Sequence, residues 1–409
     1  MALIVQKFGG TSVGDIDRIK NVATKVKKEL DKGNQVAVVV SAMAGVTNQL
    51  VGYVQALSSL DSAIACEEYD QVVSSGEQIT CGLLSLALNE IGIPAQSFTG
   101  WQIPLVTDKA HGKARIKSID PTKMHAVLKA GKVAVIAGFQ GIDDNGRVAT
   151  LGRGGSDTSA VALAAALKAD RCDIYTDVDG VYTTDPRIVS GARKLDRISY
   201  EEMLELASLG AKVLQTRSVE MAMNHQVIVQ VLSSFEDKPG TLLVKEDDIV
   251  EQKNITGIAF SRDEARISLT DIANIPGMSA TLFGPLADAG INVDMIVQNI
   301  TEDGRATDIT FTVGRGDLDK AVKAVEEVHS ILQYKSLHVD KNVAKVSAIG
   351  VGMRSHAGIA QTMFKALADK NINILVISTS EIKISILIAE EYTELAVRAL
   401  HAAFDLEKA

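Results

Sequence analysis

Two glycine-rich segments carry charged side chains that could act on a phosphate or a carboxylate. The first is KFGGTS at residues 7–12, which directly follows a short apolar stretch. Glycines let backbone N–H groups approach a phosphate closely, and Lys7 could neutralise the charge that develops on a transferred group. The same residues also fit a tight strand-to-helix turn with a solvated lysine, and physical reasoning alone leaves both interpretations open.

The second segment is LGRGGSD at residues 151–157, which precedes the helical pattern TSAVALAAALKA. Glycines before a helix N-terminus form a ready site for an anion, and Arg153 could hold a carboxylate through two parallel hydrogen bonds. Ser156 and Asp157 could instead be ordinary helix caps. A cap does not explain an arginine among three glycines, so we favour a functional site.

Three further segments hold polar side chains whose roles are ambiguous from residue type alone. TDVDGVYTTDPR at 176–187 could frame a nucleotide, or it could be a surface loop rich in Asp, Gly and Pro. SSGE at 74–77 opens a helical pattern, where Glu77 could hold an ammonium group or simply complement the helix dipole. Ser41 and Thr47 flank an Ala/Gly turn and share this ambiguity.

Several sequence motifs of other enzyme classes are missing. The chain has no G-x-x-x-x-G-K-[ST] phosphate loop, no G-x-G-x-x-G after a strand, no protein-kinase signatures and no G-x-S-x-G elbow. The seven histidines lack metal-ligand spacing, so we expect no metal site formed by the protein itself.

The glycine-rich segments lie next to predicted strands. Apolar runs predict strands at 2–8, 36–40, 133–138 and 173–177. Helices are predicted over 16–30 (capped by Asp15), 78–91 and 157–169, the second with an apolar face of Ile79, Leu83, Leu86 and Ile91. This alternation predicts an α/β fold whose mainly parallel sheet is sandwiched by helices, with ligands at the carboxyl ends of its strands. Asn145-Gly146 adds a predicted hairpin.

The C-terminal part contains an internal repeat. Residues 276–299 align without a gap to 357–380, and each copy has the pattern β-α-β-β-α. The first copy is predicted to be a complete βαββαβ unit, whereas the second lacks its last strand. We expect the apolar segment 254–260 to supply that strand, because a three-stranded sheet would leave an edge exposed. The predicted domains are 1–245, a linker and strand at 246–263, and two modules at 264–340 and 341–409.

Composition limits the partners and the compartment. A formal charge of −9 argues against nucleic-acid binding, and the longest apolar runs are far below the ~18 residues that cross a bilayer. The first residues, MALIVQKFGG, lack the features of a signal peptide. Three widely spaced cysteines fit neither a zinc site nor a disulfide framework, so we expect a reducing, cytoplasmic location.

KFGGTS, SSGE, GRGGSD and TDVDGVYTTDPR occur here in the order found in aspartate kinases, and the repeat resembles their paired ACT regulatory domains. The resemblance covers essentially the whole chain. It implies an amino-acid-kinase fold with two ferredoxin-like ACT modules, Mg-ATP and L-aspartate as substrates, and Mg²⁺ held through the nucleotide phosphates. It also implies inhibition by lysine, threonine or both, and a homo-oligomer formed through the ACT modules.

The resemblance also implies roles for individual residues. Lys7 would stabilise the transferred phosphoryl group and Asp157 would orient Lys7 rather than act as a base. The substrate-binding residues would be Thr47, Glu77, Arg153, Gly154, Gly155 and Ser156. The residues around ATP would be Lys7, Phe8, Gly9, Gly10, Ser41, Thr176, Asp177, Tyr182, Asp185, Arg187, Lys212 and Val213. Effectors would contact Asp271, Asn292, Val293, Asp294, Gln298, Asn373, Ile374, Ser380 and Glu381.

One segment departs from the family pattern, because Gln215-Thr216-Arg217 stands where many relatives have His-Pro-Arg. Two rival functions are a kinase for another acceptor, such as glutamate, acetylglutamate or a nucleoside monophosphate, and a catalytically silent amino-acid sensor. The paired modules argue against the first, and the joint presence of Lys7, Arg153 and Asp157 argues against the second.

Overall fold

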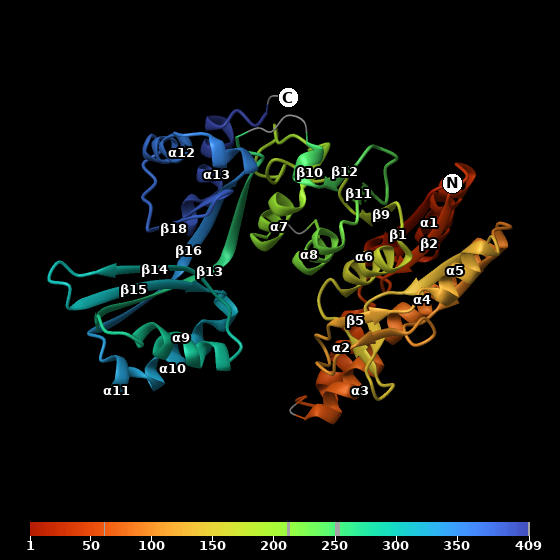
Figure 1. Cartoon of the computed structure of the whole chain (residues 1–409), viewed down its shortest axis with the longest axis horizontal. Helices are drawn as coiled ribbons and strands as arrows, with labels where there is room; N and C mark the ends of the chain where they lie inside the picture. Colours follow the sequence, from red (N-terminus) through yellow and green to blue (C-terminus); the bar gives the residue numbers. More distant parts are fainter. Residues whose placement is uncertain (61, 211–212, 250–253, 408–409) are drawn as a thin grey trace. The chain divides into compact units, whose positions relative to one another are not determined.

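The structure is a computed structural model that describes residues 1–60, 62–210, 213–249 and 254–407. It contains two compact units (Figure 1). Of the described residues, the first unit holds 1–60, 62–181, 194–207 and 213–249, and the second holds 182–193, 208–210 and 254–407. None of the helices in these ranges is long and apolar enough to cross a membrane.

The first unit is built on an eight-stranded sheet in the order β10-β12-β11-β9-β1-β2-β6-β3. Neighbouring strands are parallel except for β11 and β12, which are antiparallel. Its strands are β1 (Leu3–Phe8), β2 (Gln35–Val40), β3 (Ala95–Phe98), β6 (Val133–Ala137), β9 (Arg171–Thr176), β10 (Arg197–Ser199), β11 (Val229–Ser233) and β12 (Thr241–Val244). The strands β1, β2 and β6 are almost wholly buried and mostly apolar, as a parallel sheet covered on both faces requires.

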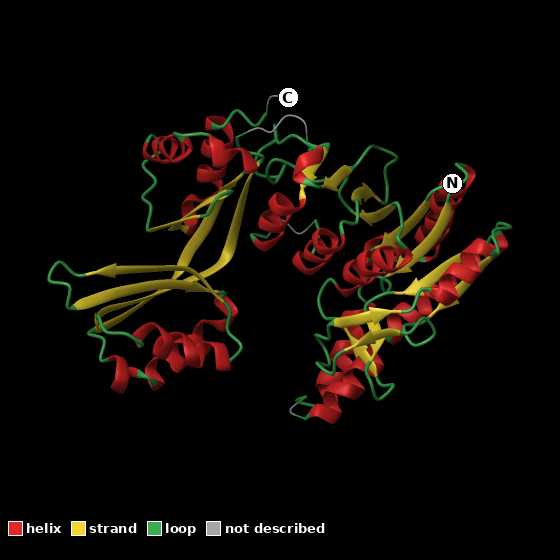
Figure 2. Ribbon diagram, in the orientation of Figure 1, coloured by secondary structure: helices red, strands yellow, loops and turns green. Residues whose placement is uncertain are grey.

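The helices of the unit are α1 (Ile16–Asp31), α2 (Val46–Leu57), α3 (Ala63–Val73), α4 (Ser75–Glu90), α5 (Thr122–Lys129), α6 (Gly155–Leu167), α7 (Tyr200–Ser208) and α8 (Thr216–His225). Helices α1, α4, α5 and α6 pack on this sheet (Figure 2), whereas α3 packs on β8 (Val148–Thr150) of a smaller sheet. Asp15 caps α1 as predicted, because its carboxylate accepts a hydrogen bond from the Arg18 N–H at 2.8 Å. Val22 and Val26 of α1 and Leu84 and Leu88 of α4 form one apolar core with the inward residues of β1, β2 and β6.

The prediction for the apolar face of α4 was wrong. The helix begins at Ser75, within the SSGE segment that was expected to open it, and its buried face contains Glu77, Leu84 and Leu88. Ile79 and Leu86, which were assigned to the apolar face, are 57% and 68% exposed. The sequence carries apolar residues around most of the helix, so periodicity alone did not identify the side that packs on the sheet.

A smaller four-stranded sheet in the order β5-β4-β7-β8 belongs to the same unit. Its strands are β4 (Leu105–Thr107), β5 (Ile116–Ile119), β7 (Gln140–Ile142) and β8 (Val148–Thr150). The predicted hairpin is confirmed: β7 and β8 are antiparallel, and Gly146 takes the left-handed conformation (φ 76°) that the turn requires.

The second unit contains one six-stranded sheet in the order β14-β15-β13-β16-β18-β17. Its strands are β13 (Gly257–Ala273), β14 (Val293–Ile300), β15 (Ala306–Val313), β16 (Ser336–Ile349), β17 (Val376–Thr379) and β18 (Lys383–Ala389). Its helices are α9 (Met278–Asp288), α10 (Leu318–Glu327), α11 (His329–Leu332), α12 (Ile359–Ala368) and α13 (Thr393–Ala403). One apolar core forms around Ile267, Leu286 and Phe311, and another around Ile258, Met363 and Leu400.

The expected pairing of segment 254–260 with the second copy is observed. Residues 257–260 pair with 346–349, and the Thr256 N–H donates to the Ile349 carbonyl at 2.8 Å. The structure differs from the expectation in one way, because β13 and β16 each run unbroken through both copies. The pairing of β13 with β16 is interrupted only by two register shifts around Glu264 and continues on both sides of them, so the two modules share a single sheet.

Part of the TDVDGVYTTDPR segment also packs within the second unit. The Ile258 N–H donates to the Thr183 carbonyl at 2.8 Å, and the Thr183 hydroxyl lies 2.9 Å from Nε2 of the buried His401. Val189, just after this segment, belongs to the apolar core around Ile258.

Candidate active site

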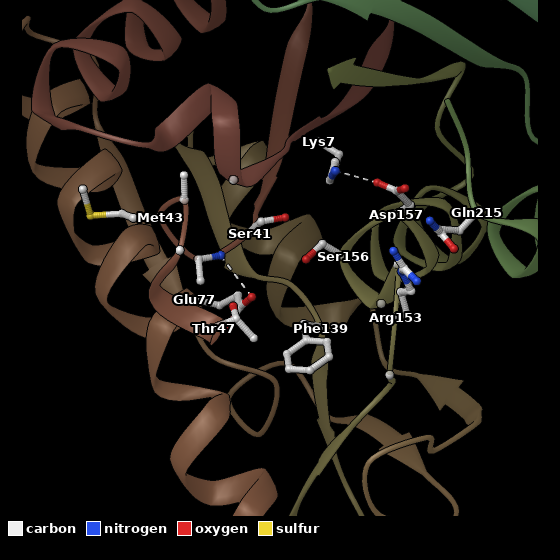
Figure 3. Close-up of a pocket in the computed structure, with 17 residues that line it drawn as sticks. Lys7, Ser41, Met43, Thr47, Glu77, Phe139, Arg153, Ser156, Asp157 and Gln215 are labelled. Carbon is white, nitrogen blue, oxygen red and sulfur yellow. Dashed lines mark hydrogen bonds and ion pairs between the residues drawn. The ribbon is translucent and has the colours of Figure 1, made fainter. Parts of the chain in front are cut away.

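A cavity of about 320 Å³ opens at the carboxyl ends of β1, β2 and β6 (Figure 3). This is the edge at which the parallel sheet was expected to bind ligands. The residues that line the cavity are Lys7, Gly10, Ser41, Ala42, Met43, Ala44, Gly45, Thr47, Glu77, Phe139, Gly152, Arg153, Gly154, Gly155, Ser156, Asp157 and Gln215.

Lys7 is the last but one residue of β1, and its side chain turns toward the first turn of α6. Its Nζ lies 2.6 Å from Oδ1 of Asp157 in a nearly buried ion pair, drawn in Figure 3. A Cβ added to Gly9 would lie 3.3 Å from this Nζ, so glycine keeps the backbone close to the ammonium group. Asp157 therefore fixes the position of the lysine at the wall of the cavity.

Glu77 presents a carboxylate oxygen to the cavity. Its Oε1 accepts a hydrogen bond from the Ala42 N–H at 3.0 Å, while the buried Oε2 has no hydrogen-bond partner in the part of the chain that the structure describes. Burial raises the pKa of Glu77 to about 7, against the opposing effect of that hydrogen bond. A cationic ligand group such as an ammonium would satisfy the free oxygen and favour the ionised form.

The loop that carries Arg153 is built from glycines. Gly154 is the N-cap residue of α6 with φ 71°, and a Cβ there would clash with the side chain of Gln215 at 1.9 Å. Ser156 and Asp157 are therefore inside the first turn and are not caps, which corrects that alternative interpretation. Arg153 itself is exposed at the cavity and forms no ion pair with any residue of the described ranges.

These side chains give the cavity a definite charge pattern. Lys7 and Arg153 are cations, Asp157 neutralises Lys7, and Glu77, which has one unpaired oxygen, lines the same space. The arrangement suits a ligand with an ammonium group and a carboxylate, together with a second anion near Lys7. In the described ranges no group of three or more His, Cys, Asp or Glu side chains is placed to hold a metal ion.

The structure brings most of the predicted substrate and phosphate residues together, since ten of them line the cavity. These are Lys7, Gly10, Ser41, Thr47, Glu77, Arg153, Gly154, Gly155, Ser156 and Asp157. Phe8 is instead fully buried and stacks on Tyr175, with ring centroids 4.5 Å apart.

The predicted nucleotide residues are more scattered. Thr176 and Asp177 lie at the end of β9, where the threonine hydroxyl donates to the aspartate at 3.0 Å. Tyr182, Asp185 and Arg187 belong to the second unit, and Arg187 pairs with Asp185 at 2.7 Å. Val213 is half-buried, and Lys212 lies outside the described residues. The nucleotide roles of these residues stay predictions.

The predicted effector residues of the first copy lie on β13 and β14. Asp271 sits at a bulge with φ 61°, where its N–H donates to Oδ1 of Asp308 at 2.9 Å. Asn292 immediately precedes β14, while Val293, Asp294 and Gln298 are on it.

The predicted effector residues of the second copy lie at the ends of β17. Asn373 and Ile374 precede this strand, and Ser380 and Glu381 follow it. Ser380 and Glu381 help to line a cavity of about 450 Å³ in that copy, with Met353, Arg354, Thr379 and Ile384.

Sequence reasoning missed three side chains of the site. Phe139 follows β6 with a positive φ of 69° and packs against Gly155, Met43 belongs to the turn after β2, and Gln215 contacts Gly154. The position of Phe139 directly after a buried strand and a glycine was a usable signal. Gln215 was noted only as a departure from the family pattern.

Comparison with known proteins agrees with this architecture. Residues 2–233 match the amino acid kinase family, and residues 266–330 and 346–404 each match an ACT domain. Fold and site thus define an amino-acid kinase with two ACT domains. The chain is 56% identical to an aspartokinase of Pseudomonas aeruginosa over 409 residues, which is 100% of this chain and 98% of the relative.

Two solved structures extend the comparison. The crystal structure of E. coli aspartokinase III in complex with aspartate and ADP superposes with a TM-score of 0.81 at 28% identity. The complex of that enzyme with lysine and aspartate has a TM-score of 0.78 at 29% identity. Each alignment covers 98% of this chain and 99% of the other. The chain belongs to the aspartate kinase family and is therefore a kinase, as the sequence motifs predicted.

Proposed function

We propose that the protein transfers the γ-phosphoryl group of Mg-ATP to the β-carboxylate of L-aspartate, giving 4-phospho-L-aspartate and ADP. The observation that carries this proposal is the meeting of Lys7, Asp157, Glu77 and Arg153 around one cavity at the carboxyl ends of the central strands. The aspartate-and-ADP complex of the E. coli relative supports the same pair of ligands.

Each charged side chain has a defined task in this mechanism. Glu77 binds the ammonium group of aspartate through its unpaired oxygen, and Arg153 binds a carboxylate. Lys7, held by Asp157, stabilises the negative charge that develops on the transferred phosphoryl group, while Gly9 and Gly10 allow the phosphates to approach the backbone.

No general base is needed for the transfer. The attacking carboxylate is ionised near neutral pH, so the barrier comes from repulsion between anions and from charge on the transferred group. Cations reduce the repulsion and stabilise the charge, and positioning brings the reacting groups together. Mg²⁺ would enter on the nucleotide phosphates as part of the substrate.

We further propose that the ACT modules make this step responsive to end products. The reaction would be the entry to lysine, threonine and methionine synthesis in the cytoplasm, with lysine, threonine or both as inhibitors and with a homo-oligomer formed through the ACT modules. The lysine complex of the E. coli relative supports an amino-acid effector.

The decisive experiment measures ADP release by the full chain with Mg-ATP and either L-aspartate or L-glutamate. We expect release that depends on aspartate and a product that hydroxylamine converts to the β-hydroxamate, as an acyl phosphate requires. Faster turnover with glutamate would identify a different acceptor. ADP release that ignores both amino acids would contradict the proposal.

A further inference from the structure

Asp70, on α3, is a fully buried carboxylate to which the proposed reaction gives no task. Its oxygens lie 2.8 Å from Nδ1 of His111 and accept hydrogen bonds from the Gly112 N–H at 3.0 Å and the Thr150 N–H at 2.9 Å. The Thr150 hydroxyl donates to it as well. A buried carboxylate is costly unless it is well hydrogen-bonded, and these bonds tie α3 to two separate chain segments.

Arg217, on α8, holds the same two segments from a different helix. Its guanidinium donates to the Leu151 carbonyl at 2.6 Å and to the Ala114 carbonyl at 2.9 Å. The Ala114 N–H also donates to the Thr150 carbonyl at 2.9 Å. Residues 111–114 and 150–151 are thus joined by backbone and by two charged side chains.

The segment at 150–151 leads directly into the glycines around Arg153. Gly152 has φ 76° and lies against residues 111–114, because a Cβ added to it would be 3.0 Å from the carbonyl oxygen of Gly112. Glycines give a chain unusual conformational freedom, and a binding group on such a chain acts well only if its surroundings fix it. Asp70 and Arg217 supply that fixation at the entrance of the loop.

We infer that Asp70 and Arg217 are positioning residues that hold the glycine loop around Arg153 and thereby set the affinity for the acceptor amino acid. Neither residue lines the cavity, so each acts through Arg153. The inference rests on the proposed role of Arg153 as the group that binds a carboxylate of aspartate.

The test compares steady-state kinetics of the full chain with those of Asp70→Asn and Arg217→Lys. Asparagine keeps the shape but offers one acceptor oxygen, and lysine keeps the charge but lacks the planar fork. We expect the KM for aspartate to rise about 10-fold in each, with the KM for ATP within about twofold. If Asp70→Asn fails to fold, Arg217→Lys carries the test alone.

Glu202→Gln is the matched control. Glu202 is a buried carboxylate of the same unit that accepts hydrogen bonds from the N–H and hydroxyl of Ser199, and it is not among the residues that line the cavity. Its substitution should leave the KM for aspartate unchanged. An equal rise in the KM for both substrates in Asp70→Asn or Arg217→Lys would indicate a purely structural role and overturn the inference.

A double-mutant cycle separates this inference from the proposed function. If Asp70 acts through Arg153, adding Asp70→Asn to Arg153→Ala should raise the KM for aspartate by less than twofold more. If the double variant raised the KM for aspartate by the product of the two single effects, the inference would be contradicted while the role of Arg153 would stand. An unchanged KM for aspartate in Arg153→Ala alone would refute the proposed role of Arg153, and the inference with it.

Discussion

The ammonium group of Lys7 lies 2.6 Å from the carboxylate of Asp157, and the two side chains are only 10% and 11% exposed. The pair joins the end of β1 to the first turn of α6, so the lysine is held in place before any substrate binds. A cation fixed in this way stabilises the transition state without the cost of reorganising at the moment of reaction.

Replacing this lysine should therefore affect the chemical step most. We expect Lys7→Ala to lower kcat by about 100-fold or more, with little change in the KM for either substrate. Lys25→Ala is the matched control, because Lys25 is an equally buried lysine of the same unit, paired with Asp237 at 3.1 Å. A near-normal kcat in Lys7→Ala would show that Lys7 is not a catalytic residue.

Arg153 should give a different kinetic signature, because a group that binds aspartate acts in both the ground state and the transition state. We expect Arg153→Lys to raise the KM for aspartate by about 10-fold or more, since lysine does not reproduce the planar fork. The KM for ATP, measured in the same preparation, should stay within about twofold. An equal loss of ATP affinity would move Arg153 to the phosphate site.

Glu77 should make aspartate binding depend on pH. Burial raises its pKa to about 7, and only the ionised form can bind an ammonium group. The KM for aspartate should fall as the pH rises from 6 to 8 and then level off. Glu77→Gln should have a high KM with a flat pH profile over this range, and a wild-type profile without any break near pH 7 would contradict the assignment.

The raised pKa of Glu77 also makes the stability of the folded chain depend on pH. Because the folded chain keeps a proton on Glu77 between pH 4.5 and 7 that the unfolded chain has lost, folding stability falls as the pH rises through this window. Glutamine does not titrate, so Glu77→Gln should lack this loss. Its free energy of unfolding, compared with that of wild type, should therefore rise by up to about 3 kcal/mol from pH 5 to pH 8. Melting temperatures of both proteins at the two pH values would test this, and parallel shifts would contradict it.

The second unit contains a buried lysine whose loss should destabilise it. Nζ of Lys345 lies 2.7 Å from Oε1 of Glu264 and 2.5 Å from Oδ2 of Asp294, and Lys345 and Glu264 are both almost fully buried. Burial lowers the pKa of Lys345, but Glu264 and Asp294 outweigh it and raise the pKa overall. Lys345→Met leaves Glu264 buried without this partner and should lower the free energy of unfolding by about 3 kcal/mol.

Thermal unfolding of the full chain would measure that cost. Arg398→Met, which removes an exposed pair with Glu394 in the same unit, should cost less than about 0.5 kcal/mol. Adding Glu264→Gln to Lys345→Met should recover part of the loss. Equal melting temperatures for Lys345→Met and Arg398→Met would show that the buried pair contributes nothing.

Local sequence patterns predicted where the strands and helices lie better than they predicted which faces of these elements are buried. The apolar runs at β1, β2 and β6 identified the sheet, and therefore the edge at which the cavity lined by Lys7 and Glu77 opens. The exposed side of α4 was misassigned because Ile79 and Leu86 are as apolar as the residues that pack on the sheet. Which side is buried depends on tertiary contacts that a helical period does not encode.

The site was predicted from segments that follow strands, and its omissions have a common cause. Phe139 and Gln215 reach the cavity through contacts with Gly155 and Gly154, which lie far from them in sequence. Likewise, the two modules share a sheet because β13 pairs with β16 on both sides of Glu264, where the sequence suggested only a break between two strands.

Effector binding is expected on the strands that flank β15 in the first copy. Asp271 lies at a bulge of β13 and Gln298 on β14, and these two strands are the neighbours of β15 in the sheet. Gln298→Ala and Asp271→Asn should raise the concentration of lysine or threonine that halves activity by about 10-fold, without lowering kcat. Asparagine suits position 271 because it tolerates the positive φ of 61°, so charge is tested without added strain.

Glu381→Ala supplies the comparison for this last prediction. Glu381 follows β17, lines the cavity of the second copy and pairs with Arg354 at 3.4 Å, whereas Asp271 and Gln298 lie on β13 and β14 of the first copy. If the effector acts on the first copy, its inhibition should persist in Glu381→Ala while it is relieved in the other two variants. The reverse pattern would place the effector in the second copy, and unaltered inhibition in all three would refute the predicted effector residues.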